Sequence, residues 1–170
     1  MDRKCLWYYS SDGDTIEVSG GEVRPIASRD ACVLYTGARE EYFYKSAGEI
    51  DRLFLKTINA GDKEDTLFIW TYYLPGHLLT GDEWNENYTV NDTVFGSEVS
   101  FSVHIVGKIV ERSDDCCAVE RTTHVNFSSQ QFGNADSTVE SYEWYKKGIG
   151  LSRAIVNGTE YNLIDYIFLD

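Results

Sequence analysis

The stretch from Val139 to Asp170 constrains the fold more than any other part of the chain. Three runs of strand-forming residues follow one another in it. The first joins the second at Gly148-Ile149-Gly150, and the second joins the third at Asn157-Gly158. Asn-Gly between two apolar runs is a strong hairpin signal, because a type I′ turn needs positive φ at both central residues. The stretch therefore predicts antiparallel β structure, with Gly148, Gly150, Asn157 and Gly158 as structural turn residues.

Similar runs recur along the whole chain, about every ten to fifteen residues, with turn residues between them. No segment has a convincing apolar period of about 3.6 residues, which a surface helix would show. We therefore predict a single all-β domain over residues 1–170, with about 11–13 strands and little or no helix. The expected strands are Leu6–Tyr9, Thr15–Val18, Ala31–Tyr35, Glu41–Lys45, Ile50–Lys56, Thr66–Leu74, Tyr88–Phe95, Val99–Val110, Cys117–Phe127, Val139–Lys146, Leu151–Val156 and Tyr161–Leu169.

One hairpin has a register that hydrophobic and charge patterns both select. When Phe101 lies opposite Phe127, Lys108 lies opposite Glu120, and a slip by one residue would destroy both matches. Phe101, Val103, Ile105, Val125 and Phe127 then point inward. The outward face carries Ser102, His104, Lys108, Glu120, His124 and Asn126.

Two shorter hairpins follow from their turns. The Asp12-Gly13 turn pairs Tyr9 with Ile16 and Trp7 with Val18. The Asn157-Gly158 turn pairs Ala154 with Tyr161 and Leu151 with Ile164.

Two expected strands are apolar on both faces. They are Leu67–Leu74 and Tyr161–Leu169. Such a strand usually lies centrally in a sheet or beneath a covering layer. We therefore expect a strongly curved antiparallel sheet, either a half-barrel or a sandwich. We also expect Trp84 to be a structural residue, and Trp144 to anchor the core beside the Gly148–Gly150 corner, where two glycines leave room for a large ring.

The formal net charge is −13, from 15 Lys and Arg against 28 Asp and Glu. Nucleic-acid phosphates and anionic membrane surfaces need clustered cations, so this balance excludes nucleic acid as a partner. No apolar run approaches the ~20 residues of a membrane helix, and we expect no membrane-spanning segment. The N-terminal residues lack the apolar core of a signal peptide.

Four N-glycosylation sequons begin at Asn87, Asn91, Asn126 and Asn157. They favour an extracytoplasmic protein that is secreted, periplasmic or surface-anchored, although Thr-rich strands could produce the same pattern. The cysteines Cys5, Cys32, Cys116 and Cys117 form no CxxC motif. Adjacent cysteines bond to each other only with strain. Free thiols and disulfides both remain open, with no connectivity determined.

The chain contains no motif for nucleophilic or phosphate chemistry. It has no GxSxG elbow, and neither Ser19-Gly20-Gly21 nor Gly148-Ile149-Gly150 matches a phosphate-binding loop. Paired carboxylates occupy turn contexts such as Asp12-Gly13-Asp14. We expect no catalytic residue, no cofactor and no enzymatic activity.

The predicted register places His104 directly opposite His124, close enough for both imidazoles to hold one metal ion. A third ligand is not evident in the sequence. We therefore interpret the two histidines as a solvated pair, with a metal site as the weaker alternative.

The second half of the chain resembles a family of uncharacterised extracytoplasmic bacterial β-sheet domains, whose members are often lipoproteins. The family's mid-domain corner, P-L-x-x-G-D-x-W, is similar to Pro75, Leu78, Leu79, Gly81, Asp82 and Trp84. Its ending, W-Y-x-x-G-V-G-L-V-K with a later G and Y-x-L, is similar to Trp144, Tyr145, Gly148, Ile149, Gly150, Leu151, Gly158, Tyr161 and Leu163. Arg153 stands near the family's basic position, and Ser152 departs from its usual Lys or Val. The resemblance implies a curved antiparallel sheet outside the cytoplasm and assigns no catalytic residues.

Two functions fit these observations. The first is a non-catalytic module that binds a protein partner or assembles with itself. The alternative is a carrier that holds a lipid-like or other apolar small molecule in a concave sheet, as the many aromatic residues favour. A deep apolar cavity would favour the carrier, and exposed edge strands would favour the module.

Overall fold

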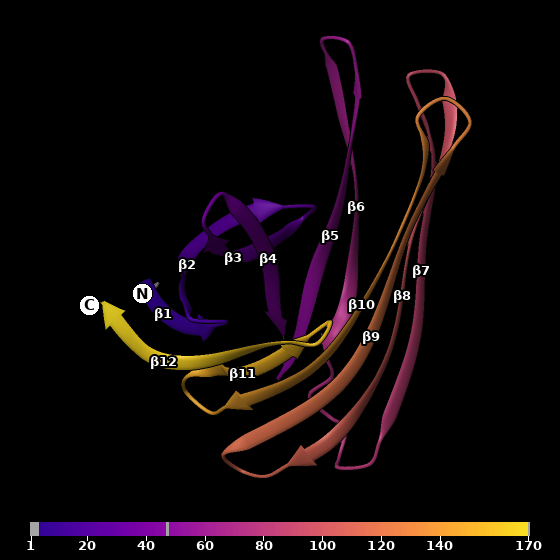
Figure 1. Ribbon diagram of the computed structural model, residues 1–170. Coiled ribbons are helices and arrows are strands. Elements are labelled where there is room, and N and C mark those ends of the chain that lie inside the picture. Colours follow the sequence, from indigo (N-terminus) through magenta and orange to yellow (C-terminus); the bar gives the residue numbers. More distant parts are fainter. Residues whose placement is uncertain (1–3, 47, 170) are drawn as a thin grey trace.

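The computed structural model describes residues 4–46 and 48–169. These residues form one antiparallel sheet of twelve strands, nearly closed into a barrel, and include no helix (Figure 1). The strands are β1 (Lys4–Ser11), β2 (Asp14–Ile26), β3 (Arg29–Thr36), β4 (Arg39–Ser46), β5 (Glu49–Ala60), β6 (Lys63–Leu74), β7 (Glu83–Val94), β8 (Ser97–Arg112), β9 (Cys116–Ser129), β10 (Gly133–Lys146), β11 (Gly150–Val156) and β12 (Thr159–Leu169).

The sheet consists of two six-stranded meanders that meet at the ends of the chain. β1 to β6 are neighbours in chain order, as are β7 to β12, and β1 pairs with β12 in the middle of the sheet. The open edges are therefore β6 and β7, which follow one another in the chain. In Figure 1, β2–β4 curl into a roll on one side, while β5–β6 and β7–β10 rise as two long arms on the other.

The predicted fold class is confirmed. Each of the twelve expected strands lies within or largely overlaps one observed strand, and most observed strands extend further at both ends. The extensions contain Gly, Asp, Asn and Ser, residues that propensity places in turns. Pairing with a neighbouring strand overrides that preference, so the boundaries of the expected strands were too short.

The register of the long β8–β9 hairpin is also confirmed. Phe101 lies opposite Phe127, Lys108 opposite Glu120 and His104 opposite His124. A bulge after Ile109 shifts the pairing by one residue, so the predicted alternation ends there. Phe101, Val103, Ile105 and Phe127 are buried, and Val125 is half-buried.

The two shorter hairpins are confirmed near their turns. Tyr9 lies opposite Ile16, Trp7 opposite Val18 and Ala154 opposite Tyr161. The predicted pairing of Leu151 with Ile164 is wrong. The β11–β12 pairing ends at Arg153 and Asn162, and further along Leu151 pairs with Tyr145 on β10.

β6 is an edge strand, which corrects the expectation that Leu67–Leu74 lies centrally or under a covering layer. One face of β6 enters the barrel core with Leu67 and Ile69. On the other face, Trp70 packs against a small separate core of Ala31, Val33, Tyr42 and Leu53. The rest of that face is open, since Phe68 is 49% exposed. The second apolar face of β6 is therefore only partly covered, at Trp70, by the small core of the β2–β4 roll.

Trp144 is half-buried and does not belong to the core, so that prediction is wrong. Its ring packs on Tyr142, with ring centroids 4.3 Å apart, and under the Arg153 guanidinium. The corner at Gly148 and Gly150, where both glycines have positive φ, is instead held from β1. Trp7 Nε1 donates to the Ile149 carbonyl at 2.8 Å, and Tyr9 Oη donates to the Leu151 carbonyl at 2.7 Å.

The segment between β6 and β7 is held in place from β8. Arg112 at the end of β8 donates to the carbonyls of Gly76 at 2.8 Å and Leu78 at 2.6 Å. Between the two edge strands, β6 and β7, the Tyr72 N–H donates a hydrogen bond to the Tyr88 hydroxyl at 3.1 Å. These bonds hold two edge strands close together.

Trp84 at the start of β7 is buried against Gly107 on β8. A Cβ on Gly107 would lie 2.3 Å from a ring carbon of Trp84. The missing side chain at residue 107 therefore provides the space that the ring occupies.

Gly107→Ala should destabilise the fold by about 1–3 kcal/mol, because the new methyl overpacks a rigid indole. Chemical denaturation of the single variant and of the Trp84→Leu double variant measures this. With the ring removed, the alanine should cost much less, which gives a coupling energy between the two positions. Equal costs in both backgrounds would contradict the proposed contact.

Candidate functional site

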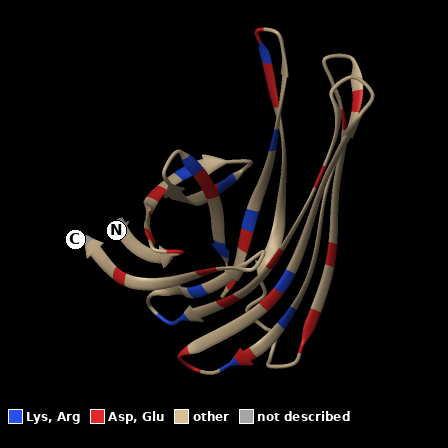
Figure 2. Ribbon diagram, viewed as in Figure 1, with Lys and Arg blue, Asp and Glu red and all other residues tan. Residues whose placement is uncertain are grey.

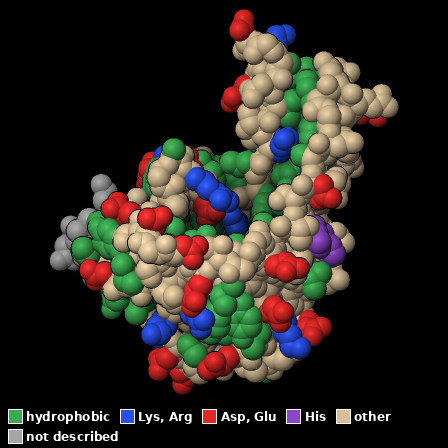
Figure 3. All heavy atoms as spheres, viewed as in Figure 1, with side chains coloured by type: hydrophobic (Ala, Val, Ile, Leu, Met, Phe, Trp, Pro, Cys, Tyr) green, Lys and Arg blue, Asp and Glu red, His purple; other side chains and the backbone are tan. Residues whose placement is uncertain are grey.

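A cavity of about 710 Å³ lies inside the barrel. Strands β4 and β5 form one wall, and β9 to β12 form the other. Figure 3 shows basic side chains within a hollow between the rolled strands and the rising arms. Six charged side chains line it, namely Arg39, Glu40, Glu41, Arg52, Arg121 and Glu143.

Arg121 and Glu143 form a buried ion pair in this wall. Arg121 Nη1 donates to both carboxylate oxygens of Glu143, each at 3.0 Å, and the two side chains are 1% and 6% exposed. The hydroxyls of Tyr73 and Tyr145 also donate hydrogen bonds to the Glu143 carboxylate. Arg121 Nη2 donates to the Tyr73 carbonyl at 2.8 Å, which ties β9 to β6 across the barrel. Within this group, one buried side-chain atom lacks a hydrogen-bond partner among the described residues, and that atom is Arg121 Nε.

Burial and mutual attraction compete in setting the charges of this group. Burial favours the neutral acid of Glu143, but Arg121 and the Tyr145, Ser141 and Tyr73 hydroxyls outweigh it, so the pKa of Glu143 lies below its ordinary value. Burial, followed by the Glu143 charge, raises the pKa of Tyr145 well above its ordinary value. The pair therefore stays charged near neutral pH, and the phenol stays a donor.

Arg52 on β5 is bound less completely. Its Nη2 donates a hydrogen bond to Glu41 at 2.7 Å. Glu41 also forms an ion pair with Arg39, with the nitrogen and oxygen 3.0 Å apart. The guanidinium lies 5.1 Å from the centroid of Phe54 and 5.3 Å from that of Tyr73. Burial would lower the pKa of Arg52, but Tyr73 and nearby carboxylates outweigh it and raise the value, so Arg52 is cationic.

Sequence reasoning missed these residues, although one signal was present. The confirmed β8–β9 register places Arg121 on the inward face together with Val119 and Phe127. A charged residue at an inward position of a strand needs a buried partner. The partner, Glu143, lies on the next strand, β10, and Tyr73 comes from the other meander.

The outward face carries most of the residues that the sequence singled out. His104 and His124 stack with ring centroids 5.7 Å apart, and each has another partner, Asn85 and Thr138 respectively. No group of three or more potential metal ligands occurs among the described residues. The structure thus places the two histidines side by side.

All four sequon asparagines are exposed. Asn87 and Asn91 lie on β7, Asn126 lies on β9, and Asn157 has positive φ in the β11–β12 turn. Cys32, Cys116 and Cys117 carry free thiols. The described residues include no helix long and apolar enough to cross a membrane.

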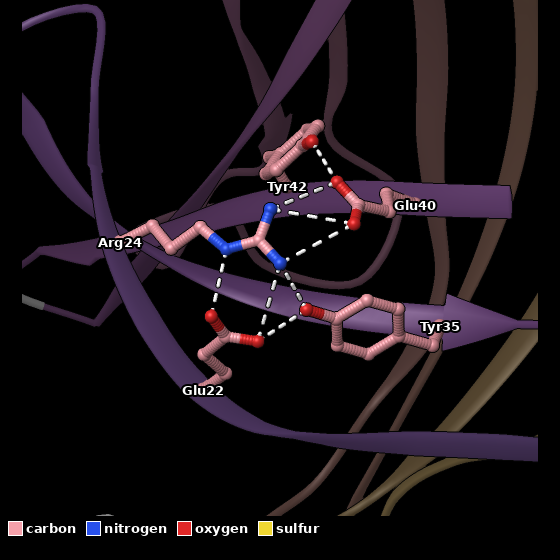
Figure 4. A network of polar contacts seen from close by, with 5 residues as sticks. All are labelled: Glu22, Arg24, Tyr35, Glu40 and Tyr42. Carbon is pink, nitrogen blue, oxygen red and sulfur yellow. Dashed lines mark hydrogen bonds and ion pairs between the residues drawn. The ribbon is translucent and has the colours of Figure 1, made fainter.

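A second polar network lies on the β2–β4 roll, on the face that also carries its small core (Figure 4). Arg24 sits between the carboxylates of Glu22 and Glu40, with Nε at 2.7 Å from Glu22 and Nη1 at 3.0 Å from Glu40. The Tyr35 and Tyr42 hydroxyls complete the network. The Tyr42 and Arg24 hydrogen bonds lower the pKa of Glu40. The three charged side chains of this network are 31–49% exposed and bond to one another, so we regard the network as structural.

Comparison of the chain with protein-family models, curated proteins and solved structures finds no match. The resemblance to extracytoplasmic bacterial domains therefore stays a prediction.

Glu143→Gln should destabilise the protein by about 3–5 kcal/mol, because it leaves the Arg121 charge buried without a counter-ion. Glu160→Gln is the matched control, since Glu160 pairs with the exposed Arg153 and should cost no more than ~1 kcal/mol. Urea unfolding measures both. A loss for Glu143→Gln no larger than the control's would contradict a buried Arg121 that depends on Glu143 for its counter-ion.

The same ion pair should make stability depend on pH. The pKa of Glu143 is below its ordinary value of 4.5 in the folded chain. The unfolded chain therefore takes up this proton first, and the stabilisation present above that ordinary value is lost as the pH falls through the folded value. Urea unfolding of wild type and Glu143→Gln, from about pH 7 to about pH 3, should show their stability difference shrinking on the acid side. A constant difference would contradict the lowered pKa.

Proposed function

We propose that this protein is a non-catalytic binding protein that holds a small amphipathic molecule inside its barrel. The interior cavity carries the proposal, because its volume of about 710 Å³ falls within the ~300–1,000 Å³ usual for small-molecule pockets. Ligand sites of this kind combine an apolar surface with a few polar groups that fix orientation.

The cavity wall has both components. Apolar side chains come from β5, β9, β10 and β11, and the charged side chains come from β4, β5, β9 and β10. The apolar residues include Phe54, Val125, Val139, Leu151, Ala154 and Val156. A wholly apolar molecule would displace water from the charged groups beside it and offer them no hydrogen bond in return, which costs free energy. The mixed lining therefore favours a ligand with one polar end over a purely lipid-like one.

The ionisable groups of the wall favour binding over acid–base chemistry. Glu143 is held by Arg121 and phenols with its pKa lowered, and Glu41 is shared by Arg39 and Arg52. A general acid or base near neutral pH needs a pKa close to the working pH. The lowered pKa of Glu143 moves that carboxyl away from this range.

A second candidate function, binding of a protein partner, is favoured by the sheet edges. β6 and β7 end the sheet, and an unpaired edge can take up another strand. Beside that edge, Leu55, Phe68 and Tyr72 are between 43% and 49% exposed. Acidic side chains are spread over both arms (Figure 2), which would suit a basic partner. The extracytoplasmic location belongs to both candidates and stays a prediction.

Filling the cavity tests the proposal. Val139 lines the cavity, whereas its neighbour Thr138 lies on the outer face and bonds to His124. Val139→Trp should weaken binding of Nile red, a neutral dye whose emission reports an apolar site, by about tenfold or more, which corresponds to ~1.4 kcal/mol. Thr138→Trp should leave the dye affinity unchanged.

Fluorescence titration with both variants and the wild type gives the three affinities, and circular dichroism checks that each is folded. An equal effect of the two tryptophans, or no saturable dye binding by the wild type, would contradict an interior binding site.

A further inference from the structure

Arg52 is the cation of the cavity wall with donor capacity to spare. A guanidinium has five N–H donors, and in the part of the chain that the structure describes, Glu41 is the one hydrogen-bond acceptor for the Arg52 side chain. The side chain is 20% exposed, so it reaches the cavity without being fully solvated. Unpaired N–H groups in such a place attract an acceptor from outside the protein.

The other two cavity arginines differ from Arg52. Arg121 is committed to Glu143 and to the Tyr73 carbonyl, and almost no solvent reaches it. Arg39 is 71% exposed and lies at the rim. Arg52 is therefore the cavity cation that a bound molecule can engage at a partly desolvated site, where a charge-assisted hydrogen bond is strongest.

The charges of the cavity wall balance. Three arginines, Arg39, Arg52 and Arg121, and three glutamates, Glu40, Glu41 and Glu143, line it. Glu40 is held by Arg24, and Arg39 lies at the rim. The wall is thus neutral in a chain whose net charge is −13, and the cation available to a ligand is Arg52.

The immediate surroundings of Arg52 fit a planar anion. The rings of Phe43, Phe54 and Tyr73 lie within 5.8 Å of the guanidinium and limit its movement. A guanidinium fixed in this way presents parallel N–H groups that match the two oxygens of a carboxylate. Beyond it, Val125, Val139 and other apolar side chains line the cavity.

We infer that the cavity takes an amphiphilic organic anion whose carboxylate binds Arg52 and whose apolar body lies along the apolar residues of β9 to β11. This inference rests on the proposed binding function and adds the ligand's charge and orientation. The ligand carboxylate and Glu41 compete for the same guanidinium. Removal of each residue's charge should therefore change affinity in opposite directions.

Displacement of Nile red by three ten-carbon probes with different head groups tests the inference. Decanoate is the anion, 1-decanol the neutral probe and decyltrimethylammonium the cation. Wild type should bind decanoate most tightly, by about tenfold or more over decanol, as expected for a charge-assisted hydrogen bond. Arg52→Gln should abolish this preference and leave the decanol affinity unchanged, and Glu41→Gln should strengthen decanoate binding several-fold.

Arg153→Gln is the matched control, because Arg153 lies on the outer face against Trp144 and pairs with Glu160. It should change none of the affinities, and near-ultraviolet circular dichroism verifies that each variant is folded. Equal decanoate and decanol affinities in wild type, or an Arg52→Gln variant that keeps the preference, would overturn the inference while leaving the cavity function intact. If none of the probes, including the dye, binds, the proposed function fails as well.

Discussion

The contact of Arg121 with Glu143 and Tyr73 is the interaction on which the interior of this protein depends. It joins β9 and β10 of one meander to β6 of the other, at the point where the sheet has no continuous hydrogen bonding. An ion pair removed from water needs hydrogen-bond partners, because each unpaired buried charge costs several kcal/mol. The two tyrosine hydroxyls and the Tyr73 carbonyl provide them, and Arg121 Nε is the buried atom of the pair left without one among the described residues. Moving β6 away from β9 would remove two of these partners and leave more of the pair unsatisfied.

The barrel core is arranged around this polar centre. Apolar residues of β5, β6, β8 and β9 pack together in the main cluster, with Phe101, Ile105 and Ile109 almost completely buried. The cavity lies beside them, where arginines and glutamates replace aliphatic side chains. A fold built only for stability gains little from buried ion pairs, since apolar residues of similar volume serve as well or better. The charged wall is for that reason an argument for the ligand binding proposed above.

The pairing of β1 with β12 decides where the sheet can open. Because the first and last strands meet in the middle, the edges fall at β6 and β7, which the chain itself connects. Short connections keep sequential strands close, and Arg112 fastens this connection by bonding its carbonyls. Between β6 and β7 the barrel is thus held together by side chains and a loop, without a backbone ladder.

Local sequence determined the strands, the turns and one long register, because each depends on interactions between neighbouring residues. The Asn157-Gly158 turn, the β8–β9 pairing through Phe101 and Phe127, and the antiparallel class all follow from alternation and turn chemistry. Alternation along β9 also puts Arg121 at an inward position, but the sequence does not show which residues pair with its charge. The order of the strands, the edge position of β6, the outer location of Trp144 and the meeting of Arg52, Tyr73, Arg121 and Glu143 were decided only by the tertiary structure. Residues 52 and 73 come from one meander and residues 121 and 143 from the other. Only the closure of the sheet brings them together, and no short-range pattern encodes how a curved sheet closes.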